Sequence, residues 1–391
     1  MIKRTLAKKI KEYTRHYPVV AVTGPRQSGK TTLVRSLFPT KPYLNLEDLE
    51  TREFAEKDPK GLLGQYADGA VIDEAQRVPK LFSLLQTIAD ETRKNGQYIL
   101  TGSQNFLLLE GITQSLAGRV AIAHLLPLAL EELAEAYKGF TRITIEEVLL
   151  KGFYPKLFDQ KMDASSYYQN YIQTYVERDV RLIKNIENLS TFRKFLQLVA
   201  ARVGQLLNIT SLGNDCGINQ ATVKAWLSIL EASFIIFLLQ PHHRNFNKRV
   251  VKTPKIYFYD TGVLCALLHI TQASQLKSHY LRGGIFESMV IAEWLKHRFH
   301  RGLVPRAFFW RDKTGHEVDL VIERHGGLLP IEIKSGQTVA SEFFDGIAYY
   351  RAISKQAASS YIVYGGEQTQ KRQAASVLGW RDWPQVLATF D

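Results

Sequence analysis

The stretch GPRQSGKTT, residues 24–32, decides the fold of the first part of this chain. It fits the pattern G-x-x-x-x-G-K-[ST] in full. The apolar run VVAV at residues 19–22 precedes it and predicts a buried strand, while the residues after it have the apolar spacing of a helix. A strand, a glycine loop and a helix in this order are typical of a phosphate-binding loop, so a chance glycine-rich turn is the weaker interpretation.

The residues of this loop supply several kinds of phosphate contact. Its glycines permit a tight turn whose backbone N–H groups point inward, and the following helix adds the positive end of its dipole. We expect Lys30 to reach the β- and γ-phosphates and the Thr31 hydroxyl to ligate Mg²⁺. The expected cofactors are therefore ATP and Mg²⁺. The predicted nucleotide-binding residues are Gly24, Pro25, Arg26, Gln27, Ser28, Gly29, Lys30, Thr31 and Thr32.

A second acidic element follows in GAVIDEAQ, residues 69–76. Residues 70–72 have the composition of a buried strand, and Asp73 and Glu74 stand at its carboxyl end. We expect Asp73 to hold Mg²⁺ through water and Glu74 to polarise the attacking water as general base. The competing interpretation is an acidic pair that caps the helix after it.

Polar residues near two further strands are weaker candidates. The strand in QYILTGSQN, residues 97–105, is followed by the polar residues Ser103 and Gln104. Either residue is a candidate for sensing the γ-phosphate, and we assign this role to Ser103. Asn45 either touches the water or Glu74, or is only a turn residue. Arg119 is a candidate for neutralising phosphate charge, in cis or in trans.

The stretch EVDLVIERHGGLLPIEIKSG, residues 317–336, carries a second chemical pattern. Apolar and acidic residues alternate on either side of a Gly-Gly turn, which predicts a hairpin with Asp319 beside Glu332 and with Lys334 on the same face as Glu332. This is the Asp…Glu-x-Lys arrangement of Mg²⁺-dependent phosphodiester cleavage, in which carboxylates hold the metal and the lysine positions water. Glu287 on an upstream helix is expected as an additional metal ligand. The alternative is a degenerate site kept for binding or assembly.

The middle of the chain predicts a nucleic-acid-binding element. Residues 208–232 have helix-turn-helix spacing, and residues 233–259 follow as strand, basic turn and strand, the shape of a wing. The alternative is a contact with protein. Arg178 is a candidate trans-acting finger, but a surface ion pair with Glu177 or Asp179 of a neighbour is the stronger interpretation. The basic residues of the expected wing are His242, His243, Arg244, Lys248, Arg249 and Lys252.

Composition narrows the class of protein. The net charge of +12 favours a polyanionic partner, because Lys and Arg release counterions from phosphates. Only two cysteines, Cys216 and Cys265, are present, which excludes a disulfide framework. No run of about 18 apolar residues suggests a membrane span, and the N-terminus lacks the apolar core of a secretory signal. We therefore expect a cytoplasmic protein without a membrane partner.

With these motifs in view, the chain resembles the bacterial and archaeal P-loop ATPases of the AAA superfamily that carry a C-terminal domain of unknown function. The resemblance covers nearly the whole chain. It rests on GPRQSGKTTL, VIDEAQ, LTGSQN, SLAGR, LLPLALEEL, YVERDV, TPKIYFYDTG, GIFESMV, HEVDLVIE and LPIEIKSG. One departure from the nuclease pattern is Val318, which stands before Asp319 in place of proline and removes no ligand.

The resemblance implies an α/β architecture with a P-loop NTPase parallel sheet and a helical lid, then a winged helix, then a fold like the PD-(D/E)XK restriction-endonuclease-like nucleases. The expected parts are an ATPase domain at 1–155, a helical linker at 156–190, a winged-helix segment at 191–258 and a nuclease-like domain at 259–391. The leading hypothesis is an ATP-hydrolysing homo-oligomer that acts on DNA. The alternatives are an ATP-regulated assembly switch that binds a protein partner, and a nuclease gated by ATP.

Overall fold

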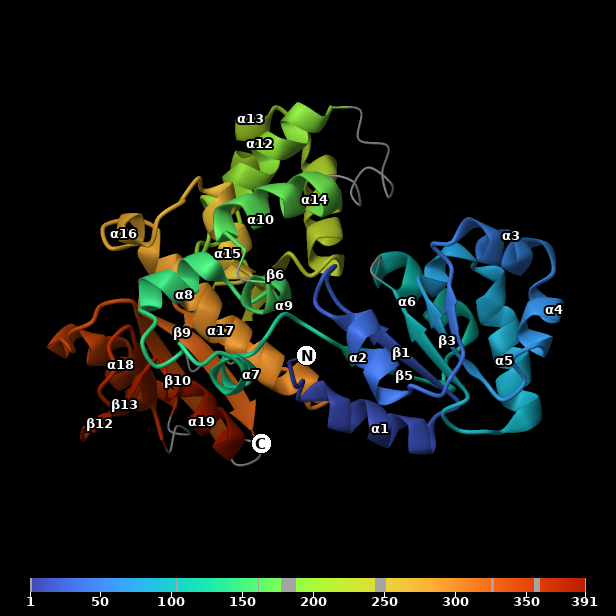
Figure 1. The fold of residues 1–391 in the computed structure, drawn as a ribbon. Coiled ribbons are helices and arrows are strands. Elements are labelled where there is room, and N and C mark those ends of the chain that lie inside the picture. Colours follow the sequence, from blue (N-terminus) through green and yellow to red (C-terminus); the bar gives the residue numbers. More distant parts are fainter. Residues whose placement is uncertain are drawn as a thin grey trace. The chain divides into compact units, whose positions relative to one another are not determined.

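The computed structural model describes residues 2–102, 105–160, 162–176, 188–242, 251–324, 327–354 and 359–390. These residues form two compact units. Unit 1 consists of Met1–Leu128 together with Ala232–Phe234 and Arg298–Leu303. Unit 2 consists of Ala129–Glu231, Ile235–His297 and Val304–Asp391. Figure 1 shows the elements of both units coloured along the sequence.

In its described part, unit 1 contains a five-stranded parallel sheet with the order β2-β3-β4-β1-β5. The strands are β1 Val19–Thr23, β2 Tyr43–Asn45, β3 Ala70–Asp73, β4 Tyr98–Thr101 and β5 Val120–His124. Because all strands run in one direction, their carboxyl ends meet at one edge of the sheet. The sequence-predicted strands at 19–22 and 70–72 are confirmed, and this edge receives the loops that follow them.

Helices cover both faces of this sheet (Figure 1). They are α1 Leu6–His16, α2 Lys30–Leu37, α3 Leu49–Lys57, α4 Pro59–Gly64, α5 Lys80–Thr92 and α6 Asn105–Ser115. In β1, Val20 and Val22 pack with Leu6 and Leu33 of α1 and α2. Val19 and Ala21 point to the other face, where α5 and α6 contribute to the core. Burial on both faces explains why β1 is apolar without alternation.

The described residues of unit 2 contain an eight-stranded mixed sheet with the order β12-β13-β11-β10-β9-β8-β6-β7. Antiparallel pairing joins β9 to β10 and β6 to β7, while β6 pairs in parallel with β8. The strands are β6 Ile236–Pro241, β7 Lys255–Phe258, β8 Ala307–Arg311, β9 Glu317–Arg324, β10 Gly327–Lys334, β11 Tyr361–Tyr364, β12 Gln370–Lys371 and β13 Ser376–Gly379. The hairpin predicted around the Gly-Gly turn is thus present as β9 and β10.

In unit 2, α18 packs on β9 and β10, whereas α12, α13 and α14 lie together away from these strands (Figure 1). The longest of the helices described, α17, has 19 residues and carries Trp294 in the core. The helices are α7 Leu130–Ala136, α8 Ile145–Lys151, α9 Pro155–Asp159, α10 Ala164–Tyr171, α12 Leu189–Ala200, α13 Ile209–Cys216, α14 Gln220–Ala232, α15 Thr261–Leu267, α16 Ala273–Leu276, α17 Arg282–His300, α18 Asp345–Ser354 and α19 Trp383–Leu387. The helices α7 to α9 lie within residues 125–160, where the helical lid and a linker out of the ATPase core are expected, and they belong to unit 2.

In the segment expected to be a winged helix, the helices α13 and α14 are followed by the strands β6 and β7, which is the expected order. Gly217, with φ of 72°, ends α13 and allows the turn into α14. The apolar positions expected on one face of α14, such as Val223 and Trp226, are buried. His242 corrects the expectation for the wing, because this side chain is buried and lies 3.2 Å from Glu323 of β9. His243, Arg244, Lys248 and Arg249 lie outside the described residues.

The boundaries expected at 155, 190 and 258 stay a prediction. What the structure adds is that β6 and β7 belong to the same sheet as the C-terminal strands, through the pairing of β6 with β8. No helix among the described residues is long and apolar enough to cross a bilayer.

Candidate functional site

The phosphate-binding loop connects the end of β1 to the first residue of α2. Gly24 has φ of 141°, Gln27 of 59° and Gly29 of 94°. A Cβ atom on Gly24 would collide with the carbonyl oxygen of Leu125, so only glycine fits there. These left-handed positions bend the backbone tightly before the start of α2, as an anion nest requires.

Lys30 begins α2 and is buried, with 7% of its surface exposed. Its Nζ donates to the carbonyl oxygens of Gly24 at 2.9 Å and of Pro25 at 2.8 Å. The ammonium group therefore lies across the loop, next to the place where the loop would hold phosphate. A buried ammonium at this place would interact strongly with phosphate oxygens, because the attraction between opposite charges is stronger in the interior than in water.

Asp73 at the end of β3 is the centre of a hydrogen-bond network. Its Oδ2 accepts from the hydroxyls of Thr31 at 2.9 Å and of Tyr43 at 2.6 Å. Its Oδ1 accepts from the backbone N–H of Glu74 at 3.1 Å and from the hydroxyl of Thr101. The structure thus brings Thr31 of the loop to Asp73, and this hydroxyl–carboxylate pair fits the oxygen ligands that Mg²⁺ prefers.

Sequence reasoning missed Tyr43 and Thr101. Thr101 ends β4, the strand beside β3, so the rule that strand ends share one edge was a signal for it. Tyr43 begins β2 and lies opposite Val71 in the register of β2 and β3, which requires the strand order to be known. Burial and the hydrogen bond to Asp73 raise the pKa of Tyr43 well above its usual value, so the hydroxyl stays a donor.

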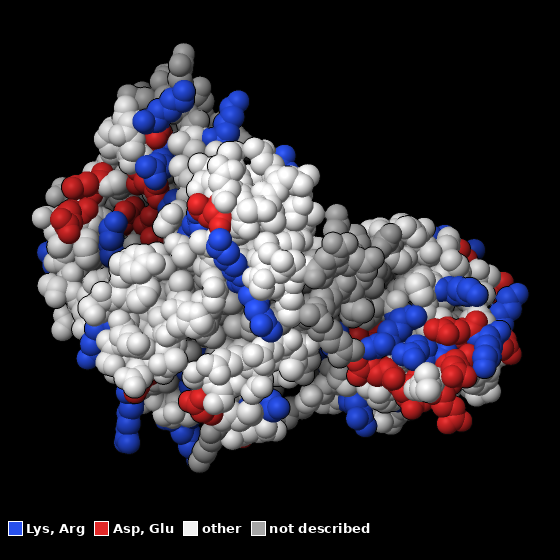
Figure 2. Space-filling model, turned by 90° about the horizontal axis from the view of Figure 1, so that it is seen from above, with Lys and Arg blue, Asp and Glu red and all other residues white. Residues whose placement is uncertain are grey.

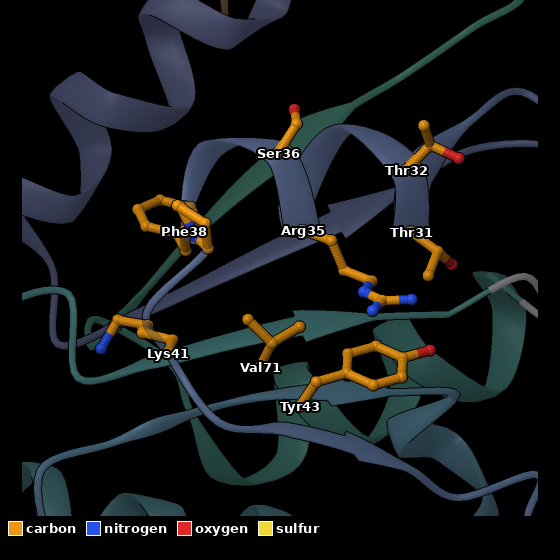
Figure 3. A pocket seen from close by; sticks show the side chains of 9 residues that line it. Thr31, Thr32, Arg35, Ser36, Phe38, Lys41, Tyr43 and Val71 are labelled. Carbon is orange, nitrogen blue, oxygen red and sulfur yellow. The ribbon is translucent and has the colours of Figure 1, made fainter. Parts of the chain in front are cut away.

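A cavity of about 520 Å³ opens beside these residues, as Figure 3 shows. Arg35 extends from α2 toward Tyr43 (Figure 3), and its guanidinium lies 4.8 Å from the centre of the Tyr43 ring. The lining residues are Thr31, Thr32, Arg35, Ser36, Phe38, Pro39, Lys41, Tyr43 and Val71. The wall of the cavity is therefore continuous, through Tyr43, with the carboxylate of Asp73.

Glu74 follows Asp73 and adopts a left-handed conformation with φ of 54° and ψ of 41°. Its Oε2 accepts from Nε2 of Gln76 at 2.6 Å. Gln76 was not predicted as a site residue, although it stands in the same motif. Asn45 has its side-chain oxygen bonded to the backbone N–H of Glu47 at 3.0 Å, as a turn residue would. Ser103, the expected sensor, lies outside the described residues.

Arg119 does not lie at the phosphate loop of its own chain. It precedes β5, and its neighbour Val120 pairs with Val19 at the amino end of β1. The loop follows the opposite, carboxyl end of β1, so a role in cis is contradicted. The guanidinium instead binds both carboxylate oxygens of Asp90, at 2.5 Å and 2.9 Å. A role across an interface between copies stays a prediction, as it does for Arg178, which lies outside the described residues.

Arg4 is a further residue that sequence reasoning missed. It is 6% exposed and stands just before α1. One terminal nitrogen donates to the carbonyl oxygen of Ser28 at 2.8 Å, and the other donates to that of Leu126 at 2.6 Å. Arg4 therefore fixes the outer side of the phosphate loop to the chain after β5. No local pattern marked it, because both of its partners are backbone atoms far along the chain.

The second cluster of predicted residues lies in unit 2. The register of β9 and β10 pairs Leu320 with Ile331, which places Asp319 opposite Glu332. Asp319 Oδ2 accepts from the backbone N–H of Ile333 at 2.8 Å, and Lys334 Nζ lies 2.7 Å from Glu332 Oε1. These three residues are gathered as the hairpin pattern predicted.

Glu287 of α17 belongs to the same electrostatic cluster. Its Oε2 accepts from the hydroxyl of Tyr257 at 2.8 Å. Burial, and after it the neighbouring charge of Asp319, raise the pKa values of Glu287 and Glu332. Burial also raises the pKa of Asp319, against the lowering effect of Lys255. Each of these buried carboxyl groups therefore disfavours the charged form of its neighbour.

Two observations weigh against a formed metal centre in this cluster. In the described part of the chain, no three His, Cys, Asp or Glu side chains are gathered as a metal-binding group. Lys255 of β7, missed from the sequence, is buried and forms an ion pair with Glu317. Burial alone would lower the pKa of Lys255, but Glu287, Asp319 and Glu317 raise it, so this ammonium already balances part of the negative charge.

Trp310 and Arg311, which precede the hairpin, are both engaged within the protein. Trp310 has 0% of its surface exposed and packs in the core with Val318 and Tyr350, so it cannot stack on a nucleic acid. Arg311 lies 3.0 Å from Glu317 and is engaged in an ion pair.

In the region of Figure 2 where charged side chains are densest, both signs of charge occur together. On the visible face of unit 1, basic and acidic side chains lie intermingled (Figure 2). Unit 1 also contains surface ion pairs, such as Lys57 with Glu53 at 3.1 Å and Lys94 with Asp68 at 3.4 Å. The net charge of +12 is therefore not collected into one basic patch on this face.

Three parts of the chain match families of known proteins. Residues 16–134 match the family described as AAA domain. Residues 142–274 and 282–383 match two families that are each described as a domain of unknown function, DUF8612 and DUF4143. The first part of the chain is therefore a P-loop ATPase domain of the AAA type. Asp319, Glu332 and Lys334 lie in a domain whose function is unknown.

Curated relatives extend over most of the chain. Two uncharacterized proteins, one of Mycobacterium tuberculosis and one of Mycobacterium bovis, are each 29% identical to it over 341 residues. The match covers 86% of this chain and 74% of each relative.

Likeness to solved structures is distant. A Walker-type ATPase of Pyrococcus abyssi is 16% identical, with 68% of this chain and 96% of that chain covered and a TM-score of 0.45. DnaA of Aquifex aeolicus, solved with AMPPCP bound, is 15% identical, with 58% of this chain and 85% of that chain covered and a TM-score of 0.26. At these TM-scores neither likeness adds to the argument.

Proposed function

We propose that this protein is an Mg²⁺-dependent ATP hydrolase of the AAA type that acts on DNA through its winged-helix and nuclease-like parts. The observation that carries the hydrolase is the hydrogen bond of 2.9 Å between Thr31 of the phosphate loop and Asp73. It joins the loop to the acidic strand end that carries Glu74. The match of residues 16–134 to an AAA domain supports the same assignment.

Each of the residues at this edge has a separate task. The loop backbone and Lys30 bind and neutralise the phosphates. Thr31 and Asp73 would hold Mg²⁺, which supplies Lewis-acid stabilisation of phosphate charge. Glu74 takes the proton from the attacking water. The left-handed backbone at Glu74, with φ of 54°, sets the direction in which its side chain leaves the strand end.

The experiment measures ATP hydrolysis by the purified full chain with Mg²⁺. We expect Lys30→Ala to abolish hydrolysis, and Glu74→Gln to lower the rate about 100-fold while ATP still binds. Glu53→Gln, an exposed residue on α3, is the matched control and should keep the wild-type rate. If Lys30→Ala hydrolyses ATP at the wild-type rate, the assignment of the site is wrong.

Action on DNA rests on the helix-turn-helix of α13 and α14 and on the net charge of +12. Gln220, Lys224 and Ser228 are exposed along α14. These few polar side chains suit contact with the backbone or shape of DNA better than the reading of bases.

The decisive measurement is the ATPase rate with and without DNA, together with a binding assay at low salt. We expect DNA to stimulate the rate. We also expect Lys224→Glu to weaken binding more than Lys60→Glu, which makes the same charge change at an exposed position of α4. A rate unaffected by DNA, with no binding at low salt, would remove DNA from the proposal.

Cleavage of DNA is the finer part of the proposal. The adjacency of Asp319 and Glu332, with Lys334 at 2.7 Å from Glu332, supports it. Incubation of plasmid with Mg²⁺ or Mn²⁺ tests it, and we expect Lys334→Ala to abolish any cleavage. Cleavage that survives this substitution would come from a contaminant.

A second candidate is an ATP-regulated assembly switch whose C-terminal part binds a protein and cuts nothing. Lys255 inside the carboxylate cluster favours it, because an ammonium that pairs with Glu317 takes the place of part of the charge of a metal. Homo-oligomers are expected under both candidates. The oligomeric state, measured with ATP and with ADP, together with the absence of any effect of DNA, distinguishes this candidate from the first.

A further inference from the structure

Gln76 is a buried amide beside the proposed general base. It lies in the short 3-10 helix η1, Ala75–Arg77, and has 4% of its surface exposed. Its Nε2 donates to Oε2 of Glu74 at 2.6 Å. One end of this side chain therefore holds the carboxylate that would take the proton from water.

The other end of Gln76 has no hydrogen-bond partner within the chain as described. Its Oε1 is buried and unpaired. A buried acceptor without a donor is destabilising, so such atoms are rare unless a ligand or water completes them.

The unpaired oxygen lies beside the first residue after strand β4. A Cβ atom on Gly102, the residue directly after β4, would collide with Gln76 Oε1. Strand β4 lies between β3, which ends in Asp73, and β1, which leads into the phosphate loop. The acceptor is thus placed at the end of the strand between these two parts of the site.

We propose that Gln76 is a positioning residue for ATP hydrolysis, which donates to Glu74 through Nε2 and accepts from the attacking water through Oε1. The inference rests on the hydrolase proposed above. The water oxygen forms a bond to the γ-phosphorus while the bond from that phosphorus to the oxygen of ADP breaks. One proton of the water passes to Glu74, and Gln76 keeps both of its amide protons. A glutamine suits this task because one neutral group both donates and accepts.

The test compares kcat for ATP with the dissociation constant of a non-hydrolysable ATP analogue. In Gln76→Leu we expect kcat to fall about 10- to 100-fold, while the dissociation constant changes less than about threefold. In Gly102→Ala the amide stays in the chain but is displaced by the added methyl group, so we expect kcat to fall in the same direction. Only a residue that acts on the chemical step separates the two quantities in this way.

Gln97→Leu is the matched control. Gln97 is also a buried glutamine of unit 1, with 3% of its surface exposed, but it precedes β4 at the opposite edge of the sheet. It donates to the carbonyl oxygen of Ala67 at 2.8 Å and accepts from Thr92 at 2.8 Å. Its loss should lower the melting temperature and leave kcat unchanged.

The outcomes separate this inference from the hydrolase proposal. A wild-type chain that hydrolyses no more ATP than Lys30→Ala overturns the hydrolase and the inference together. A wild-type chain that hydrolyses ATP, while Gln76→Leu or Gly102→Ala has the same kcat, overturns the inference alone. A dissociation constant that rises as much as kcat falls also overturns it, since that result indicates a collapsed loop. If Gln76→Leu does not fold, the kcat of Gly102→Ala decides.

Discussion

At the scale of single residues, Asp73 is the residue on which we expect the response of the proposed site to Mg²⁺ to depend. Both of its oxygens are engaged, and Thr31 and Tyr43 donate to the same one. A carboxylate held by neighbouring donors keeps one orientation, and such supporting groups tune metal affinity. In the proposed site, Tyr43 would therefore support metal binding without contacting the metal.

Tyr43→Phe removes the hydroxyl and keeps the ring against Arg35. We expect the Mg²⁺ concentration for half-maximal ATP hydrolysis to rise about tenfold, because Asp73 loses a fixed orientation. A titration of the rate with Mg²⁺ measures this. Tyr98→Phe is the control, since it removes a hydrogen bond of 3.2 Å to Tyr66 in the same unit without touching Asp73. Equal Mg²⁺ dependence in both variants would contradict the role of Tyr43.

His124 makes unit 1 sensitive to acid. It ends β5, lies 2.8 Å from the hydroxyl of Thr23, and packs between Phe234 and Phe299. Burial lowers the pKa of His124 from 6.5 to about 4. The unfolded chain therefore binds a proton between these values that the folded chain does not bind, so stability is lost as the pH falls.

Between about pH 7 and pH 5, His124 should contribute a loss of about 2 kcal/mol in the free energy of unfolding. His124→Gln keeps a hydrogen-bonding group opposite Thr23 but does not titrate, so its acid loss should be smaller by that amount. Denaturant unfolding at several pH values measures the difference. An identical pH dependence in wild type and variant would show that the histidine is already accessible to protons.

At the scale of elements, the segment before α1 supports the phosphate loop. Arg4 binds the carbonyl oxygens of Ser28 and Leu126, one in the loop and one after β5. Hydrogen bonds from a charged group contribute about 1.5–3 kcal/mol each. The loop is therefore held from outside as well as by its own glycines.

Arg4→Leu should weaken binding of ATP about tenfold, since the loop loses its outer support, and should destabilise unit 1 by about 3 kcal/mol. Calorimetric titration with a non-hydrolysable ATP analogue measures the first effect and thermal unfolding the second. Arg15→Leu, which changes an exposed arginine at the end of α1, should alter neither. Unchanged affinity in Arg4→Leu would limit Arg4 to a role in folding.

The elements that the sequence predicted are those fixed by local patterns. The loop around Lys30 follows from glycines and a flanking strand and helix, and the β9–β10 hairpin from alternation around a turn. Tyr43 and the buried His242 depend on which strands become neighbours, which no local pattern specifies. Arg119 was predictable, because a residue before a parallel strand lies at the edge opposite the ligand.

At the scale of the whole molecule, unit 1 is not one continuous stretch of chain. Residues Ala232–Phe234 and Arg298–Leu303 belong to it. Phe234 and Phe299 pack on His124, with ring centres 5.6 Å and 5.1 Å away, and the backbone N–H of Leu126 lies 3.2 Å from His300 Nε2. The AAA match, which ends at residue 134, therefore leaves out part of the compact unit.

A fragment of residues 1–134 should consequently be destabilised at β5. We expect the amides of Val120–His124 to exchange hydrogen at least about tenfold faster in the fragment than in the full chain. The amides of β3 serve as the internal control. Their exchange rates should change less, because β3 makes none of the contacts with Phe234, Phe299 and His300. Equal protection of β5 in both proteins would show that the distant segments add nothing to the stability of unit 1.

The left-handed backbone of Glu74 has a consequence for how this site can change over time. A side chain at φ of 54° is strained by about 1 kcal/mol, and glycine would relieve that strain. A chain with Glu74→Gly should therefore be inactive yet more stable than one with Glu74→Ala. Within the proposed hydrolase, activity and backbone strain are thus tied to the same position, because the carboxylate that would take the proton stands on the strained residue.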